Sequence, residues 1–289
     1  MNKSLLFPVL TFLILLLPIQ SASAFYQNGM LLNSVLMHFD FSEYDEEREV
    51  LNESGFLYGA ELEFGTKIGT KPFWFSTTGQ VLRGVVNYDG ETQNGVPHQT
   101  TTNELIYDWN MQIGRIYESW RRHDYATIYA GVGFHQWIRD INSKFNPLAG
   151  VDQTGENVIG LFERYTWYYA NVGARGFIFR TQRAHMLIEL NLLRTLSPIM
   201  EVSFRGQKDP AKVSLGEHYG AKLSLPIRYE ITRRFQIYSE FFFEAWDLGR
   251  SKRQNITENG IVYSKGGLFE PRSTSRFKGV VLGVFLRFE

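Results

Sequence analysis

The sequence of 289 residues has no cysteine, no excess of either charge and, after residue 24, no long apolar run. The absence of cysteine excludes disulfides and thiolate metal sites. Its 30 basic and 30 acidic side chains give a formal net charge of zero, so nothing in the charge balance indicates nucleic acid as a partner. The spacing of its His, Asp and Glu residues matches neither a zinc site nor a calcium loop, and we therefore expect no cofactor.

The first 24 residues have the composition of a secretory signal peptide. Lys3 is their only charged side chain, an almost unbroken apolar run extends from Leu5 to Leu17, and Ala22-Ser-Ala24 gives a small–x–small cleavage pattern. The run is shorter than the ~20 apolar residues of a membrane anchor. We therefore expect a signal peptide at residues 1–24 and, because no linker rich in Pro, Ser or Gly divides the remainder, one domain at residues 25–289.

Ten segments of the remaining chain alternate apolar and polar residues with the period of two that is typical of β-strands. The last segment, Gly279–Glu289, shows the pattern most clearly. One of its faces is wholly apolar, with Val280, Leu282, Val284, Leu286 and Phe288, and the other is mixed, with Val281, Gly283, Phe285 and Arg287. Short turns alternate along the chain with longer polar stretches, which we expect to be loops, near residues 45–55, 89–103, 140–158, 197–217 and 249–276.

Apolar outward faces, with long loops at one end of the strands and short turns at the other, are typical of a bacterial outer-membrane barrel. Such a barrel has lipid outside and a crowded polar lumen inside. The sequence therefore predicts an all-β fold, a ten-stranded antiparallel up-and-down transmembrane β-barrel in the cell outer membrane of a Gram-negative bacterium. In such a barrel the last segment closes the wall by pairing with Met30–Tyr44. The last segment also resembles the C-terminal signal that such proteins present to the barrel-assembly machinery, except that Glu289 follows the aromatic Phe288.

The same alternation predicts which side chains fill the lumen. We expect a network of paired charges, because an unpaired buried charge is costly, and large inward rings such as Trp137, Trp167 and Trp246. On the first segment we expect Asp40 to face inward and Phe39 and Phe41 to face outward. The expected lumen charge network is Glu61, Glu63, Asp108, Arg139, Glu163, Arg175, Glu189, Lys222, Arg228, Glu240, Glu244 and Arg287.

With ten strands, a signal peptide and long outer loops, the chain resembles the omptin family of outer-membrane endopeptidases, which carry their active site at the extracellular rim. The resemblance implies an Asp-x-Asp pair beyond the third strand and an Asp-x-His pair beyond the seventh, which activate a water between them. Asp89-Gly-Glu91 has the first spacing. Glu217 and His218 are adjacent and would face opposite ways on an extended strand. Asp89, Glu91 and His218 are the catalytic candidates, and the motif is not intact.

The leading hypothesis is therefore a non-enzymatic barrel with a largely plugged, charge-paired lumen and a structural or surface-interaction role for its long extracellular loops. Its expected partners are outer-membrane lipid and lipopolysaccharide, and the barrel-assembly machinery during biogenesis. Basic residues of the last loop are able to contact lipid phosphates; they are Arg250, Lys252, Arg253, Arg272 and Arg276. The alternatives are an omptin-like endopeptidase and a narrow diffusion pore, although a selective pore usually concentrates one sign of charge along its wall.

Overall fold

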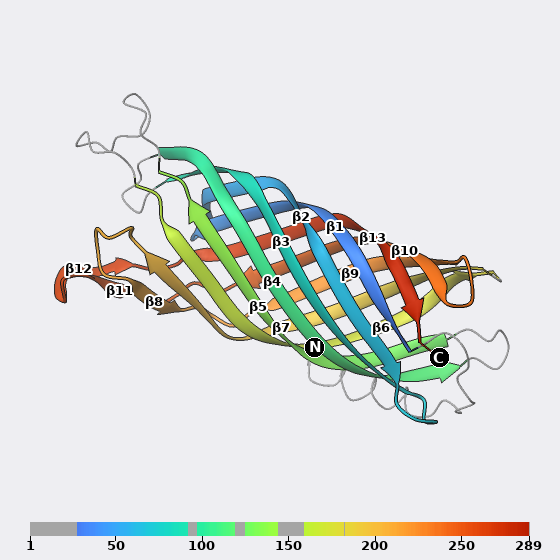
Figure 1. Ribbon diagram of the computed structural model, residues 1–289. Helices are drawn as coiled ribbons and strands as arrows, with labels where there is room; N and C mark the ends of the chain where they lie inside the picture. Colours follow the sequence, from blue (N-terminus) through green and yellow to red (C-terminus); the bar gives the residue numbers. More distant parts are fainter. Residues whose placement is uncertain (1–27, 92–96, 119–124, 144–158, 182, 289) are drawn as a thin grey trace.

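The structure, a computed structural model, describes residues 28–91, 97–118, 125–143, 159–181 and 183–288 (Figure 1). In these residues every regular element is a strand, and no helix is long and apolar enough to cross a membrane. The expected signal peptide, the turn expected at 120–124 and Glu289 lie outside the described residues. The strands are β1 (Gly29–Asp45), β2 (Arg48–Lys67), β3 (Phe73–Glu91), β4 (Pro97–Glu118), β5 (Tyr125–Ile141), β6 (Phe162–Arg180), β7 (Ala184–Ser203), β8 (Ala211–Ser214), β9 (Tyr219–Glu230), β10 (Phe235–Leu248), β11 (Gln254–Glu258), β12 (Ile261–Leu268) and β13 (Arg272–Arg287).

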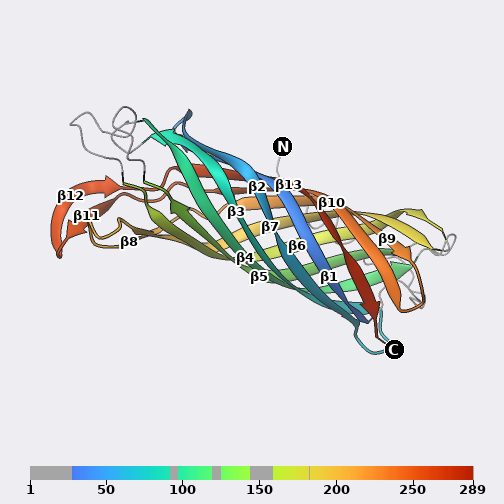
Figure 2. The ribbon, with the colours of Figure 1, turned by 45° about the horizontal axis from the view of Figure 1, so that its top comes forward.

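Ten of these strands close into one antiparallel barrel (Figures 1 and 2). The order around the wall is β6-β5-β4-β3-β2-β1-β13-β10-β9-β7, and β7 pairs again with β6. The seam between β1 and β13 extends from Gly29↔Arg287 to Tyr44↔Arg272. Closure leaves no unpaired barrel edge. β8 adds to the end of β7, and β11 with β12 forms a separate hairpin. The predicted ten-stranded barrel and its closing strand are confirmed.

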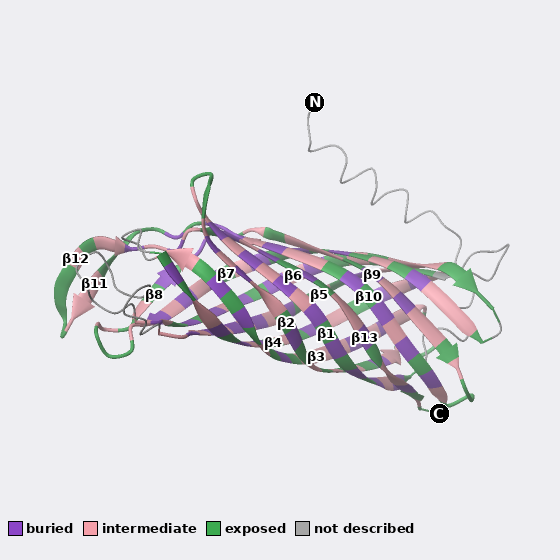
Figure 3. Ribbon diagram, turned by 90° about the horizontal axis from the view of Figure 1, so that it is seen from above, coloured by how far each residue is buried: buried purple, intermediate pink, exposed green. Residues whose placement is uncertain are grey.

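Along each barrel strand, buried and exposed residues alternate (Figure 3). The start of β1 and the end of β13 lie at the same end of the barrel. In the half of the barrel next to this end, the outward side chains form a belt of exposed apolar residues, as expected for a surface that faces lipid. The belt includes Leu32, Leu36, Tyr58, Leu62, Phe64, Val81, Tyr107, Trp109, Ile113, Val132, Val172, Ile188, Leu190, Leu192, Leu223, Ile237, Phe241, Phe243, Leu282 and Leu286. On the other side of a border near Asp40 on β1 and Lys278 on β13, the outward residues are largely polar. We call the part of the barrel beyond this border the outer half.

The alternation of β1 is opposite to the predicted one. Phe39 and Phe41 are fully buried in the lumen, whereas His38 and Asp40 lie on the outer surface, where Asp40 contacts Lys278 at 3.6 Å. At belt height both faces of β1 carry apolar residues, with Val35 and Met37 in the lumen and Leu32 and Leu36 toward lipid, so only its outer part distinguishes the two faces. Beyond the belt the barrel has water outside, so burial favours apolar side chains in the lumen and polar ones outside. The outer part of β1 alternates apolar and polar residues as a lipid-facing strand does, but its apolar residues face the lumen and its polar residues face outward.

The polar stretches expected as loops near 45–55 and 89–103 are largely strand. β1 and β2 are joined by a tight turn at Glu46 and Glu47, with Glu46 in the left-handed region (φ 59°). β3 continues to Glu91, and β4 begins at Pro97. A polar composition predicts a loop only if strands end at the membrane border. In this barrel the paired walls continue into water, where both faces of the outer rim tolerate polar residues.

Candidate functional site

All twelve residues of the expected lumen charge network lie at inward positions of their strands. The register shows this directly, because Glu61 is opposite Gln80, Gln80 is opposite Asp108, and Asp108 is opposite the buried His135. Arg287 lies at the inner mouth, 4.0 Å from Glu230. Two residues, Arg139 and Glu163, belong to the outer half. The other nine line one cavity at the level of the belt; they are Glu61, Glu63, Asp108, Arg175, Glu189, Lys222, Arg228, Glu240 and Glu244.

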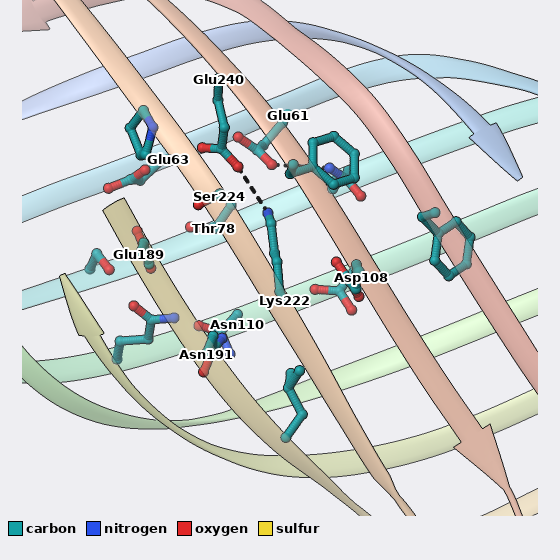
Figure 4. Close-up of a pocket in the computed structure, with 18 of the residues that line it drawn as sticks. Glu61, Glu63, Thr78, Asp108, Asn110, Glu189, Asn191, Lys222, Ser224 and Glu240 are labelled. Atoms are coloured by element: carbon teal, nitrogen blue, oxygen red, sulfur yellow. Dashed lines mark hydrogen bonds and ion pairs between the residues drawn. The ribbon is translucent and has the colours of Figure 1, made fainter. Parts of the chain in front are cut away.

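This membrane-level chamber has a volume of about 140 Å³ and is lined mainly by polar side chains. Figure 4 shows Lys222 reaching from β9 toward Glu240 on β10, and the two charges are 3.2 Å apart. Across the chamber, Arg175 Nε lies 2.6 Å from Glu189. The side-chain amide of Gln80 donates to Glu61 at 3.0 Å. Charge pairing and hydrogen bonding therefore satisfy much of the interior at the height where a barrel is surrounded by lipid.

Aromatic side chains meet inside the lumen above this chamber, and we call them the aromatic plug: Phe39, Trp137, Trp167, Trp246 and Phe277. Phe39 on β1 contacts Phe277 at 5.3 Å between ring centroids and Trp137 on β5 at 5.6 Å. Trp246 on β10 contacts Trp167 on β6 at 5.8 Å. Neither β1 and β5 nor β10 and β6 are neighbours in the wall. These contacts therefore cross the lumen, and edge-to-face packing of this kind fills the width of a narrow barrel.

The outer half contains a second polar cluster, centred on Arg139. Its guanidinium is fully buried and lies 3.2 Å from Glu43, 3.0 Å from Glu53 and 2.7 Å from Glu163. It also stacks over the ring of Phe41, at 4.6 Å from the centroid. Three carboxylates and one aromatic face thus hold a single cation, from strands β1, β2 and β6 around β5.

Two more carboxyl groups complete this outer cluster, so that it has five acids and one base. Trp137 Nε1 donates to Glu104, and Tyr165 Oη donates to Glu270 at 2.6 Å. A cavity of about 320 Å³ lies above it, lined in part by Glu43, Glu163 and Glu270. Burial raises the pKa of Glu43 to about 7, against the lowering effect of Arg139, and also raises the pKa values of Glu163 and Glu270.

The sequence predicted two members of the outer cluster, Arg139 and Glu163, and missed the other four acids. Glu43 lies in the first expected strand, on the face of Phe39 and Phe41 that was expected to point outward. Glu53 lies in a stretch expected to be a loop, and Glu270 lies in the connection between β12 and β13. A usable signal was present for Glu53. It follows the alternation of β2 if that strand is extended outward from Leu57 by four residues. No sequence signal indicates Glu270, because the fold of the last loop brings it to Tyr165.

The catalytic candidates implied by the omptin resemblance do not come together. Asp89 and Glu91 lie on β3 at outward positions, where Gln99 donates to Asp89 at 3.2 Å and Arg48 contacts Glu91 at 2.5 Å. His218 lies immediately before β9, with its Nδ1 3.9 Å from Asp247. In the closed wall, four strands separate β3 from β9 in either direction. In the described part of the chain, no three His, Asp or Glu residues are grouped so that they could hold a metal ion.

Comparison with known proteins gives a structural likeness alone. No family model matches the chain, and no curated protein sequence does. Among solved structures, the outer membrane protease OmpT from Escherichia coli aligns over 92% of this chain and 99% of its own, at 10% identity and a TM-score of 0.56. The transport unit of the autotransporter AIDA-I from Escherichia coli covers 95% of this chain and 94% of its own, at 6% identity and a TM-score of 0.44.

At 10% identity, the likeness to OmpT concerns the fold and not the chemistry. It confirms the resemblance to omptins in architecture. The apolar belt is an independent observation on the same point, since it has the place and composition of a lipid-facing surface. The chain is therefore an outer-membrane β-barrel with ten antiparallel strands, and it lies in the outer membrane.

Proposed function

We propose that this protein is a closed, non-enzymatic outer-membrane barrel that acts through its outer loops on surface molecules. The observation that carries the proposal is the aromatic plug, whose rings touch across the lumen between strands that are not neighbours. The salt-bridged chamber beneath it and the Arg139 cluster above it support the same conclusion. A lumen obstructed by side chains at three successive levels offers no continuous path for a solute, which leaves the outer end as the place of function.

The positions of Asp89, Glu91 and His218 support the non-enzymatic part of the proposal. Water activation requires the acid and the base within hydrogen-bond reach of one water. Here the acidic pair faces outward on β3, and His218 lies on the opposite side of the rim. Each candidate also has a local partner, since Arg48 contacts Glu91 and Asp247 lies near His218.

Lipopolysaccharide is the surface partner that the outer wall fits best. Arg276 and Lys278 are exposed at outward positions of β13 just above the belt, at the height of lipid phosphates. Charge-assisted hydrogen bonds to phosphate favour such residues. We expect Arg276→Gln with Lys278→Gln to weaken lipopolysaccharide binding by the refolded barrel. Exposed Arg183 and Arg233, at the opposite end, give a matched control pair. If the wild type, the Arg276/Lys278 variant and the Arg183/Arg233 control bind lipopolysaccharide equally, these two residues of β13 are not its binding site and lipopolysaccharide is not the proposed partner.

Conductance in planar bilayers tests whether the lumen is closed. The refolded wild-type barrel is expected to insert without a steady ohmic current, since the aromatic plug and the charge pairs obstruct the lumen. Insertion is verified independently by heat-modifiable migration on gels. A steady current step in most insertions would contradict the closed lumen and favour a narrow pore.

Peptide cleavage tests whether the barrel is an enzyme. Wild type, Asp89→Asn and His218→Ala are incubated with a mixed peptide library in the presence of lipopolysaccharide. We expect no cleavage above that of empty micelles for any of the three proteins. Cleavage by the wild type that disappears in either variant would establish an omptin-like endopeptidase and overturn the proposal.

A further inference from the structure

The hairpin formed by β11 and β12 exposes three consecutive large apolar side chains at its tip. Ile261 is 74% exposed, Val262 44% and Tyr263 66%. Figures 1 and 2 show this hairpin at the extreme outer end of the barrel, opposite the end where β13 finishes. Exposed apolar residues in the belt are accounted for by lipid, but the tip lies far from the belt. Ile261 and Tyr263 lie on one face of β12 and Val262 on the other. Exposed apolar side chains that lie together away from the belt indicate an interaction site.

The hairpin is held in place by contacts along its length. Asn259 and Gly260 form a two-residue turn with both φ angles positive, as an Asn-Gly hairpin turn requires. Their backbone N–H groups donate to Asp209 at 3.2 and 2.9 Å. Lys208 Nζ contacts Glu258 at 2.5 Å and lies 3.4 Å from the ring centroid of Tyr263. The tip is therefore presented in a fixed shape, and binding through it loses little conformational freedom.

The segment that leads into the hairpin is basic. Residues 249–268 contain four bases, Arg250, Lys252, Arg253 and Lys265, and one acid, Glu258. Glu258 is paired with Lys208. Lys252, Arg253 and Lys265 are exposed to solvent. An apolar tip with basic flanks is complementary to a surface that is apolar beneath and anionic at its boundary, which describes an anionic lipid bilayer.

The size of the patch favours lipid over a folded protein. A stable protein interface takes roughly 800 Å² from each partner, which three side chains cannot supply. A bilayer requires only a few inserted side chains and nearby basic groups. The bilayer in question is not the one around the belt. From Val280 at the edge of the belt to Arg272, β13 rises by ~26 Å along the strand, and the hairpin extends further outward (Figure 1).

We propose that the β11–β12 hairpin docks onto the surface of a second, anionic lipid bilayer. Ile261, Val262 and Tyr263 insert among its headgroups, and Lys252, Arg253 and Lys265 meet its lipid phosphates and carboxylates. This inference rests on the proposed role of the outer loops and specifies their partner. It gives the barrel the function of holding its own membrane near another one.

Vesicle flotation with the full-length barrel in phosphatidylcholine nanodiscs tests the proposal. The probes are phosphatidylcholine vesicles with and without phosphatidylserine. The wild type is expected to float with the anionic vesicles and not with the neutral ones, and high salt should weaken the association. Replacing Lys252, Arg253 and Lys265 by Gln should weaken it about fivefold for each charge removed. The triple variant I261S/V262S/Y263S should lose it by more than tenfold.

Two controls keep a negative result interpretable. Ile261→Ser alone leaves Tyr263 on Lys208 and so preserves the hairpin contacts, and it should still weaken binding severalfold. Gln at Lys71, Arg183 and Arg233 removes three exposed basic residues at the other end of the barrel and should change nothing. Equal flotation with both vesicle types, or unchanged binding by the tip variants, would overturn the proposal. Binding to an acidic polysaccharide in place of vesicles would overturn it as well. Conductance and peptide cleavage address the closed, non-enzymatic barrel separately, so the two proposals fail on different measurements.

Discussion

Replacing Arg139 with Met removes the only base of the outer cluster while keeping most of its volume. In the wild type, this fully buried guanidinium lies within 3.2 Å of Glu43, Glu53 and Glu163. It also lies over Phe41. The variant keeps the carboxyl groups in a buried site that no longer holds a cation. We expect a large loss of stability, because the remaining groups are mutually repulsive when they are ionised.

The expected loss is about 3–5 kcal/mol near pH 8, the usual cost of removing one partner from a buried ion pair. The lost cation–π contacts are included in this range, since they contribute only about 1–2 kcal/mol. Proton uptake limits the cost at lower pH. In the wild type, burial already raises the pKa of Glu43 to about 7 despite the opposing effect of Arg139. Without Arg139 the pKa rises further, so the folded variant binds protons that the unfolded chain does not.

The sign of the pH dependence follows from this difference. A carboxyl group whose pKa is higher in the folded state makes the protein less stable as pH rises through that pKa. The gap between Arg139→Met and the wild type should therefore narrow as pH falls from about 8 to about 5. A second substitution, Glu163→Gln, removes one of the repelling charges and should restore part of the loss at the higher pH.

Urea unfolding in detergent micelles, followed by tryptophan fluorescence, measures the effect. The matched control is Arg164→Met, which removes a half-exposed arginine paired with Glu201 on the outer surface. That substitution should cost less than about 1 kcal/mol. A loss of stability in Arg139→Met no larger than in the control, or an equal loss at both pH values, would refute a role for Arg139 in neutralising these carboxylates.

Three further predictions concern the lumen. The free energy of unfolding of the wild type should fall as the pH rises toward about 7, because the pKa of Glu43 is raised in the folded state. In Glu43→Gln this fall should be smaller, as equilibrium unfolding at several pH values would show. Gly173→Leu should cost about 1–3 kcal/mol by overpacking, since even a Cβ at this position would lie 2.3 Å from the ring of Tyr129. Joint replacement of Trp137 and Trp246 by Ala should open the aromatic plug and give conductance steps in planar bilayers that the wild type lacks.

Each of these predictions has a contrary outcome. An unchanged pH slope in Glu43→Gln would show that other groups titrate in this range. Gly176→Ala serves as the control for the glycine substitution, because nothing lies within 4 Å of its added Cβ. Equal stability of both glycine variants would contradict the packing argument. A double tryptophan variant that is folded by gel mobility but gives no conductance would mean that the chamber charges and the Arg139 cluster close the lumen without the plug.

The sequence by itself determined the barrel and, on every barrel strand except β1, which face of the strand meets the membrane. On β13, Val281 and Phe285 face the lumen, and Leu282 and Leu286 face outward, as the alternation predicts. The twelve expected lumen charges lie at inward positions for the same reason. Where lipid is the outer solvent, an outward position must be apolar, so a period of two assigns both faces without any knowledge of neighbouring strands.

The tertiary structure decided what happens beyond the membrane border. There the outer solvent is water, and the same alternation on β1 places Phe39 and Phe41 inside and Asp40 outside. The outer cluster depends entirely on closure of the wall, since Arg139 is 96 residues from Glu43 and 86 from Glu53 along the chain. Sequence periodicity is a local property, whereas the meeting of these charges is fixed by the register of strands across the barrel.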